Sequence, residues 1–233
     1  MAIEIKICGL KTPETLEAAL AAGADMVGAV FFAPSPRHLD LATAAALMAR
    51  ARGRAQVVAL TVDADDAALD DIVAAVDPQA LQLHGRETAE RVAAIRARFG
   101  RPVWKAIGIA GREDLARLPD YAAVADRLLL DAKAPKGAAL PGGNGVPFDW
   151  NLLAGLDLAK PFMLSGGLTP ENVGHALALT RARGVDVSSG VESAPGVKDP
   201  ARIAAFVRAA RAFETAAGSR ASALPAEQTS LAP

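Results

Sequence analysis

The sequence predicts an α/β fold, a single closed (β/α)8 barrel of the TIM type, on the basis of three observations. Short apolar runs typical of buried strands alternate eight times with segments that carry helix signals. The length of 233 residues suits such a barrel, which typically takes roughly 250 residues as one domain. No G-x-G-x-x-G fingerprint follows the first strand, so a doubly wound open sheet is the second choice.

The first unit shows how the alternation is recognised. Residues 3–7 form a β-rich run, and Thr12-Pro13-Glu14 supplies a cap, a proline and an acid for a helix to about Ala22, with Gly23 at its end. The later strands are expected at residues 26–32, 56–62, 80–84, 103–109, 127–131, 162–165 and 185–187. The later helices are expected at 41–51, 65–75, 87–98, 112–118 (weak), 151–156 (short), from Thr169-Pro170-Glu171 to about Thr180, and from Asp199-Pro200 to about Ala216.

Residues 1–216 are expected to form one catalytic barrel domain. Residues 217–233 lack an apolar period and are expected to form a disordered tail.

Composition narrows the function classes. The formal net charge of −1, without a basic block, predicts neither a nucleic acid nor a membrane as partner. No segment reaches the roughly 20 apolar residues of a membrane helix. A single cysteine, Cys8, excludes an internal disulfide, and we expect a cytoplasmic protein.

Several chemically distinctive residues fall at predicted strand ends. In a barrel, catalytic groups cluster at the carboxyl ends of the strands and in the loops that follow. The residues at those positions are Cys8, Arg37, His84, Asp131, Gly166, Gly167, Ser189 and Gly190.

Two of these residues could transfer protons. Asp131 ends an apolar run and precedes a long segment rich in Gly, Pro and Ala, which is long enough for a lid. Cys8 ends the first strand and could act as a base if nearby positive charge lowers its pKa. Each also has a structural interpretation, Asp131 as a turn cap and Cys8 as a small buried apolar residue. His84 could pair with Cys8 or serve only as a structural hydrogen-bonding group.

The remaining residues suggest anion binding. Arg37 lies in a proline-rich loop, where it could hold a carboxylate or simply be solvated. Gly166-Gly167 and Ser189-Gly190 follow the seventh and eighth strands, whose loops form the usual phosphate site of a barrel. The set predicts proton-transfer chemistry on a phosphorylated, carboxylate-bearing metabolite. The three histidines lie on separate elements and no cofactor fingerprint occurs, so we expect neither a metal nor a cofactor.

The sequence resembles the phosphoribosylanthranilate isomerase family of tryptophan biosynthesis from residue 4 to about residue 214. The matching segments, in family order, are Lys6-Ile7-Cys8-Gly9-Leu10, Ser35-Pro36-Arg37, Leu81-Gln82-Leu83-His84-Gly85, Leu130-Asp131, Gly142-Gly143-Asn144-Gly145, Phe148-Asp149-Trp150, Leu164-Ser165-Gly166-Gly167-Leu168, Asp186-Val187-Ser188-Ser189-Gly190-Val191-Glu192, Pro195-Gly196 and Lys198-Asp199. Asn144 departs from the family pattern, which usually has threonine there.

The resemblance implies an aldose–ketose isomerisation, the Amadori rearrangement of N-(5′-phosphoribosyl)anthranilate to 1-(o-carboxyphenylamino)-1-deoxyribulose 5-phosphate, without a cofactor. It implies that Asp131 is the general acid that opens the ribose ring and that Cys8 is the general base that takes the C2′ proton. Arg37 would hold the anthranilate carboxylate and the two glycine loops the phosphate, with His84 also among the substrate-binding residues. The expected partner is this small-molecule substrate, and the expected state is a monomer or homodimer.

Three other functions are compatible with a phosphate-binding barrel. The related sugar isomerase of histidine biosynthesis uses paired aspartates, and Cys8 argues against it. An indole-3-glycerol-phosphate synthase-like enzyme needs catalytic lysines and a glutamate at strand ends, whereas Lys6 and Lys105 lie within strands, which is not decisive. A non-catalytic phosphosugar-binding module is a different class, against which the presence of both Cys8 and Asp131 speaks.

Overall fold

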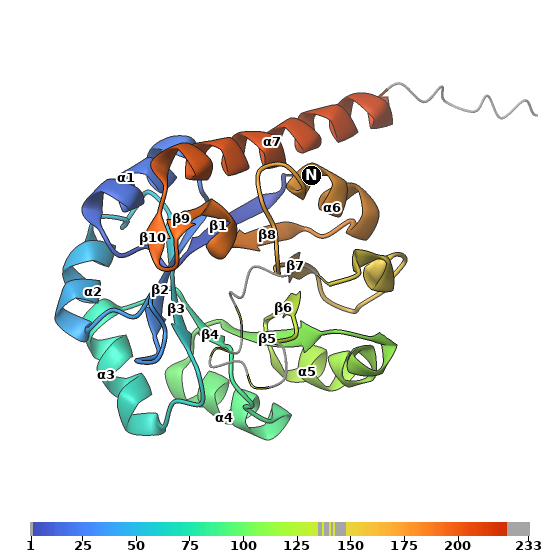
Figure 1. Cartoon of the computed structure of the whole chain (residues 1–233). Helices are drawn as coiled ribbons and strands as arrows, with labels where there is room; N and C mark the ends of the chain where they lie inside the picture. The colour runs from blue at the N-terminus through green and yellow to red at the C-terminus, as the bar shows by residue number, and fades with distance from the viewer. Residues whose placement is uncertain (1, 135–136, 138–139, 141, 143–147, 223–233) are drawn as a thin grey trace, which may run out of the picture.

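Eight parallel strands close into one barrel in the computed structural model, which describes residues 2–134, 137, 140, 142 and 148–222 (Figure 1). The strands pair in chain order, and the eighth pairs back with the first, which confirms the predicted fold. Their bounds are β1 (Glu4–Cys8), β2 (Met26–Phe31), β3 (Gln56–Thr61), β4 (Ala80–Leu83), β5 (Val103–Ile109), β6 (Arg127–Ala132), β7 (Phe162–Leu164) and β8 (Gly184–Val187).

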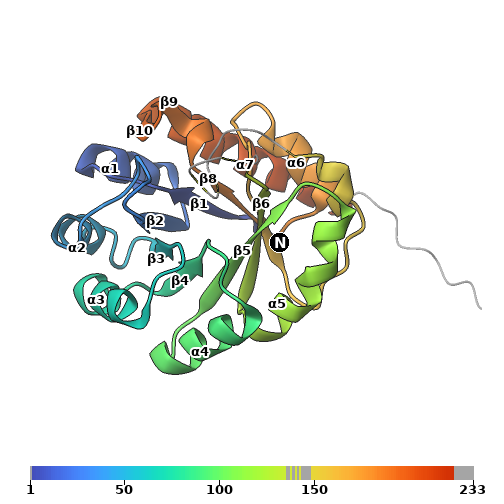
Figure 2. The ribbon, with the colours of Figure 1, turned by 60° about the horizontal axis from the view of Figure 1, so that its bottom comes forward.

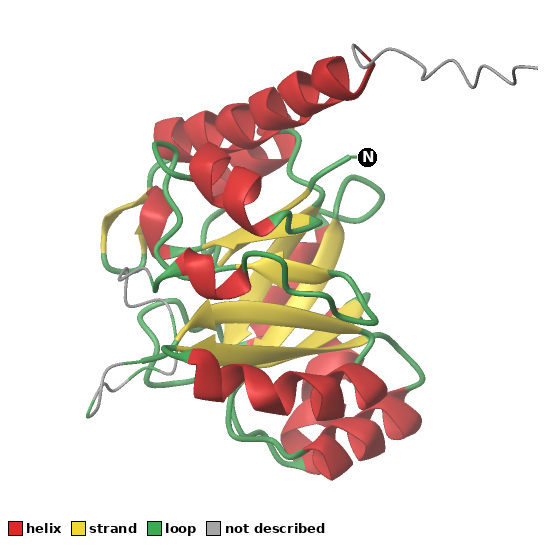
Figure 3. Ribbon diagram, turned by 90° about the vertical axis from the view of Figure 1, so that its right-hand side faces the viewer, coloured by secondary structure: helices red, strands yellow, loops and turns green. Residues whose placement is uncertain are grey.

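Helices surround the barrel, as Figures 2 and 3 show from two further directions. The α-helices are α1 (Pro13–Ala22), α2 (Leu41–Ala49), α3 (Asp66–Val76), α4 (Ala89–Phe99), α5 (Leu118–Val124), α6 (Val173–Thr180) and α7 (Pro200–Ser222). Three short 3-10 helices are η1 (Arg112–Arg117), η2 (Trp150–Leu153) and η3 (Ser189–Val191). None of the helices in these described ranges is long and apolar enough to span a membrane.

Side-chain caps begin the first four helices as local sequence chemistry predicts. The Thr12 hydroxyl accepts from the Thr15 backbone N–H at 3.3 Å, and Pro13 takes the first helical position, where its missing N–H is not needed. Gly23 ends α1 in the left-handed conformation, with φ of 87°. Asp40, Asp65 and Thr88 cap α2, α3 and α4 in the same way.

Several predicted helices differ from the structure. The weak helix expected at 112–118 is η1, and α5 continues from Leu118 because Pro119 lies in its first turn, where a proline is tolerated. The cap expected at Thr169 is wrong, since α6 begins only at Val173 after a turn. The Asn172 side chain accepts from the Thr169 N–H at 2.8 Å and donates to the Gly167 carbonyl at 2.9 Å. This side chain therefore braces the glycine loop after β7.

The C-terminal part adds features that the sequence did not predict. Strands β9 (Glu192–Ala194) and β10 (Val197–Lys198) form a small antiparallel hairpin after β8. Helix α7 extends to Ser222, beyond the end expected near Ala216, so part of the expected tail is helical. Residues 223–233, together with Asn144, lie outside the described residues.

Alternate side chains of each strand point to opposite sides, so the barrel wall separates two apolar regions. The larger core lies between the strands and helices and includes Phe206 of α7. The smaller one fills the interior with Met26, Val58, Ala80, Trp104, Ala106, Leu129 and Met163. The polar side chains of Lys6, Gln82 and Asp186, all buried, alternate with the outward apolar residues of β1, β4 and β8. A polar layer thus lies inside the barrel below its carboxyl end.

Helix α7 is held to the barrel mainly by its apolar face, and Phe206 is fully buried there. We expect Phe206→Ala to lower the free energy of unfolding by about 3–5 kcal/mol, the usual cost of emptying a buried phenylalanine site. Denaturant unfolding measures the change. Arg208→Ala, at an exposed position of the same helix, is the control and should change the free energy of unfolding little. Equal stability of both variants would contradict this packing.

Candidate active site

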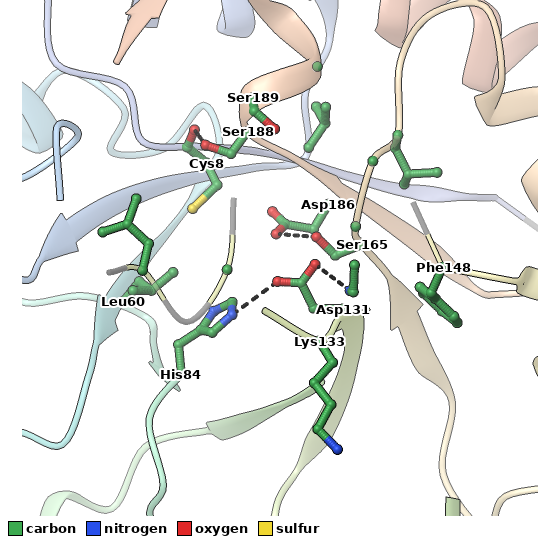
Figure 4. Close-up of a pocket in the computed structure, with 18 of the residues that line it drawn as sticks. Cys8, Leu60, His84, Asp131, Lys133, Phe148, Ser165, Asp186, Ser188 and Ser189 are labelled. Carbon is green, nitrogen blue, oxygen red and sulfur yellow. Dashed lines mark hydrogen bonds and ion pairs between the residues drawn. The ribbon is translucent and has the colours of Figure 1, made fainter. Parts of the chain in front are cut away.

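All eight residues predicted for the site line one cavity of about 300 Å³ at the carboxyl ends of the strands. They are Cys8, Arg37, His84, Asp131, Gly166, Gly167, Ser189 and Gly190. Residues far apart in the sequence meet there because the closed parallel barrel brings every strand end to the same rim. Figure 4 shows the side chains of Cys8, His84 and Asp131 converging on this cavity.

Asp131 is a buried carboxyl group at the end of β6. Its Oδ1 accepts from the Ala132 N–H at 2.8 Å, and its Oδ2 lies 3.1 Å from His84 Nε2 (Figure 4). Gln82 Nε2 lies 3.1 Å from His84 Nδ1. With the Gln82 amide donating to Nδ1, a neutral His84 carries its hydrogen on Nε2 and donates it to Asp131. The histidine is thus a partner of Asp131, whereas the sequence had left open a pairing with Cys8 or a purely structural hydrogen bond.

The approach to this pair is shaped by two glycines. A Cβ at Gly142 would lie 2.5 Å from both Asp131 Oδ2 and His84 Nε2, so only a glycine can pass this close to the pair. Gly166 has φ of 84°, and a Cβ there would lie 3.0 Å from Asp131 Oδ1. A side chain at either position would therefore crowd the carboxyl group.

Cys8 is buried at the end of β1, and its sulfur points into the cavity (Figure 4). Its carbonyl oxygen accepts from the Ser188 hydroxyl at 3.1 Å, which joins the ends of β1 and β8. Burial raises the pKa of the Cys8 thiol, while the neighbouring Lys6 acts in the opposite direction. The positive charge expected from the sequence is therefore present, but burial outweighs it, so the pKa is not depressed.

A buried ion pair that the sequence did not single out lies below Cys8. Lys6 Nζ donates to Asp186 Oδ1 at 2.8 Å, and both side chains are almost completely inaccessible to solvent. Asp186 Oδ2 also accepts from the Ser165 hydroxyl at 3.4 Å. Burial alone would lower the pKa of Lys6, but Asp186 and Cys8 raise it above its ordinary value. The period-two alternation of β1 and β8 could have indicated these inward-facing charges.

Arg37 lies at the cavity in a bidentate ion pair with Glu192 of the β9–β10 hairpin. The Nε–Oε1 and Nη2–Oε2 distances are 2.7 and 2.8 Å. Lys198 shares the same carboxylate at 2.6 Å and also donates to the Ser188 carbonyl at 3.0 Å. Two cations thus surround one anion, which leaves this side of the cavity positive. Sequence reasoning did not single out Glu192 and Lys198 as site residues, because only the fold brings Arg37 to Glu192 from 155 residues away.

The two glycine loops are in direct contact. A Cβ at Gly190 would overlap the carbonyl oxygen of Leu168, so the loop after β8 packs backbone to backbone on the loop after β7. Gly167 adopts φ of 66°, a conformation that favours glycine. Ser189 opens η3, and both glycine loops line this edge of the cavity. Such an arrangement suits a phosphate group.

Within the described ranges, no group of three His, Cys, Asp or Glu residues is arranged to hold a metal ion. The cavity instead combines a buried acid, a buried thiol, an arginine–glutamate pair and two glycine loops. Fold and site together define a TIM-barrel enzyme of the kind that carries out acid–base chemistry on a phosphorylated substrate.

Comparison with known proteins defines the family. A family model described as N-(5′phosphoribosyl)anthranilate (PRA) isomerase matches residues 5–209. A protein of Rhodopseudomonas palustris (strain BisA53) named N-(5′-phosphoribosyl)anthranilate isomerase is 68% identical over 214 residues, covering 92% of this chain and 98% of that protein. The chain therefore belongs to the N-(5′-phosphoribosyl)anthranilate isomerase family.

Solved structures agree with this assignment. The crystal structure of phosphoribosyl anthranilate isomerase from Thermotoga maritima has a TM-score of 0.82 at 34% identity, covering 91% of this chain and all of that one. A phosphoribosyl anthranilate isomerase in complex with reduced 1-(o-carboxyphenylamino)-1-deoxyribulose 5-phosphate has a TM-score of 0.77 at 32% identity, with the same coverage of both chains. The likeness thus extends over nine tenths of this chain.

Gly190 provides a test of whether this edge of the cavity binds phosphate. We expect Gly190→Ala to push the two glycine loops apart and to weaken binding of inorganic phosphate about tenfold, equivalent to about 1.4 kcal/mol. Isothermal titration calorimetry measures this affinity. Gly174→Ala in α6, where a Cβ would meet no atom within 4 Å, is the control. Unchanged phosphate affinity in Gly190→Ala would exclude this edge as the phosphate site.

The ion pair of Glu192 should make stability depend on pH. Burial would raise the pKa of Glu192, but Arg37 and Lys198 hold it below its ordinary value. The stabilisation is therefore complete above the unfolded pKa, about 4.3, and is lost as pH falls through the lower folded value. We expect Glu192→Gln to lower the melting temperature at neutral pH, with a difference that narrows in acid.

Melting temperatures of both proteins as a function of pH check this prediction. Glu113→Gln, at an exposed position of η1, is the control and should follow the unsubstituted protein closely at every pH. A difference between Glu192→Gln and the unsubstituted protein that stayed constant into strong acid would show that the carboxylate charge does not contribute.

Proposed function

We propose that this protein is an aldose–ketose isomerase that converts N-(5′-phosphoribosyl)anthranilate to 1-(o-carboxyphenylamino)-1-deoxyribulose 5-phosphate. The observation that carries the proposal is that a buried acid, Asp131, and a buried thiol, Cys8, line one cavity between an arginine and two glycine loops. The names of the family relatives and the product-like ligand named for one solved relative support the choice of substrate.

The first step requires an acid. Asp131 protonates the ring oxygen of the ribose, the C1′–O bond breaks, and the nitrogen lone pair of anthranilate forms the Schiff base. The carboxyl group is well placed for this role because its Oδ2 reaches the cavity and is oriented by His84. In this proposal His84 has two roles. It orients the Asp131 carboxyl group, and it contacts the substrate.

The second step requires a base on a different strand. Cys8, as thiolate, removes the proton from C2′, and the electron pair moves through C1′ to the iminium nitrogen, giving an enolamine. Tautomerisation of the enolamine places a proton on C1′ and leaves a ketone at C2′. The reaction is an internal redistribution of hydrogen, so no external oxidant or reductant is needed. Because burial raises the pKa of Cys8, the thiolate is the minor form at neutral pH.

The two ends of the substrate, a carboxylate and a phosphate, are both negatively charged, and each suits a different part of the cavity. Arg37 receives the anthranilate carboxylate, while Glu192 holds one edge of the guanidinium so that its plane stays fixed. The loops containing Gly167 and Gly190 receive the phosphate. Fixing both ends places C2′ and the ring oxygen between Cys8 and Asp131.

A paired-aspartate isomerase is less well supported. Asp186 also lines the cavity and would be the natural second aspartate. Its carboxylate is already held by Lys6 at 2.8 Å, which lowers its affinity for a proton and opposes its use as the base. A binding module without catalysis would not require two proton-transfer groups on separate strands.

A cytoplasmic location and a monomeric or homodimeric state complete the proposal. The location is supported by a metabolite substrate and by a single cysteine, which does not require an oxidising compartment. For the assembly, one structural relative is described as mutually generated monomers of a dimeric phosphoribosylanthranilate isomerase from Thermotoga maritima, which supports the homodimer.

Removing either proton-transfer group tests the mechanism. We expect Cys8→Ala and Asp131→Asn each to lower kcat roughly 10²- to 10⁴-fold, the usual loss for a positioned proton-transfer group. Binding of a product analogue should persist in both variants, since neither group is assigned to hold the substrate. A fluorescence assay that follows loss of the substrate, made in situ, measures the rate.

Each variant has its own contradicting result. If Cys8→Ala retains the rate of the unsubstituted protein, proton removal occurs elsewhere. If Asp131→Asn retains it, the ring opens without this acid. If the unsubstituted protein does not consume the substrate at all, the proposed activity is wrong, whatever the variants do.

A further inference from the structure

We propose that Lys6, anchored by Asp186, is the positioning residue that stabilises the Cys8 thiolate, and that Gly28 leaves the space through which its charge acts. The inference deepens the proposed function, on which its catalytic consequence rests. Lys6 does not touch the substrate in this proposal. It acts on the reaction through Cys8, two residues further along β1 on the same side of the strand.

The position of Lys6 is defined by its partner. The ammonium is fully buried inside the barrel, and Asp186 on the neighbouring strand β8 holds it at 2.8 Å. Backbone pairing aligns the two residues directly, since Lys6 and Asp186 are opposite each other in the β1–β8 register. A buried cation with this anchor cannot swing away from the sulfur, so its effect on the thiol is built into the barrel wall.

Gly28 of β2 shows how near the ammonium and the sulfur are. A Cβ at this position would lie 2.9 Å from Cys8 Sγ and 3.1 Å from Lys6 Nζ. The separation of Cys8 Sγ and Lys6 Nζ therefore cannot exceed the sum of these two distances, and Gly28 places no side chain between them. The residue has no positive φ, so its backbone does not require glycine. Glycine is needed at this position because Lys6 and Cys8 leave little space for a side chain.

Other charges near Cys8 do not substitute for Lys6. Asp186 on β8 raises the pKa of the thiol, and Lys198 on β10 lowers it but is already neutralised by Glu192 at 2.6 Å. His84 and Asp131 face the sulfur from across the cavity and are bonded to each other. Arg37 lies above Gly9, paired with Glu192. Lys6 is the cation with the largest effect on the thiolate.

The single cysteine allows a direct test without substrate. Because Cys8 is the only thiol in the chain, the pH dependence of alkylation by iodoacetamide reports its pKa alone. Lys6→Met keeps an unbranched side chain one atom shorter and removes the charge. We expect the thiol pKa to rise by at least one unit, so that alkylation at neutral pH slows about tenfold or more.

Lys105→Met is the matched control. Lys105 on β5 is the other fully buried lysine within a barrel strand, and it pairs with Glu87 at 2.9 Å. This substitution also removes a buried ammonium and leaves the Glu87 carboxylate unpaired, but at a site away from the Cys8 sulfur. Its thiol titration should follow that of the unsubstituted protein. Equal titration curves for Lys6→Met and Lys105→Met would overturn the proposal.

The double variant Lys6→Met/Asp186→Asn separates the cation from the carboxylate that Lys6→Met leaves unpaired. It also guards against poor folding of the single variant, because no buried charge remains at this site. The thiol pKa should still exceed that of the unsubstituted protein. A return to the original value would assign the effect to Asp186 and overturn the role of Lys6.

Gly28→Ala tests the geometry while every charge stays in place. The added methyl must displace the sulfur or the ammonium, and alkylation at neutral pH should slow, whereas Gly174→Ala should have no effect. Unaltered alkylation of Gly28→Ala would overturn the role of this glycine.

The catalytic consequence has a separate readout. In Lys6→Met the pH at which kcat rises should move upward together with the thiol pKa, while KM changes little. A purely structural role would lower kcat without moving this profile, and that result would overturn the proposal. If the unsubstituted protein has no isomerase activity, the proposed function fails, yet the thiol titration still decides whether Lys6 stabilises the thiolate.

Discussion

Closure of the barrel by pairing of β8 with β1 is the constraint on which the site depends. The register sets Lys6 opposite Asp186 and Ile7 opposite Val187, so the ends of the first and last strands become neighbours. Parallel closure also brings the end of every other strand to the same rim. The cavity is therefore a product of topology, and each strand contributes through the side chains at its end.

Buried charges in the barrel occur in matched sets. Lys6 pairs with Asp186, Lys105 with Glu87, and Glu192 with both Arg37 and Lys198. Removing these groups from water is costly, so each must find its counter-charge in place. The net effect on stability can be small. The consequence for function is larger, because a charge held on several sides cannot relax and keeps a constant effect on its neighbours.

The acid and the base are supported in different ways. Asp131 is held by hydrogen bonds from His84 and from its own strand end, while Cys8 lies in an apolar setting above a single anchored ammonium. Both groups also have glycines close beside them, at position 28 for Cys8 and at positions 142 and 166 for Asp131. A side chain at any of these positions would displace the atoms around the group. The small hairpin β9–β10 contributes the third support, since its Glu192 orients Arg37.

The sequence by itself determined the eight strand–helix units, the cap of the first helix and the presence of Cys8, Asp131 and the two glycine pairs at strand ends. These features follow from local chemistry, namely apolar alternation, capping and turn propensity. Local chemistry also explains the errors at the start of α6 and within 112–124, where short turns and a first-turn proline leave ambiguous signals.

Only the tertiary structure decided which polar groups meet. His84 pairs with Asp131, 47 residues away, Arg37 with Glu192, 155 residues away, and Lys6 with Asp186, 180 residues away. Residue type shows that each group needs a partner, but several partners of the right charge exist along the chain. The choice among them is made by barrel closure and strand register, which depend on the packing of all eight units together.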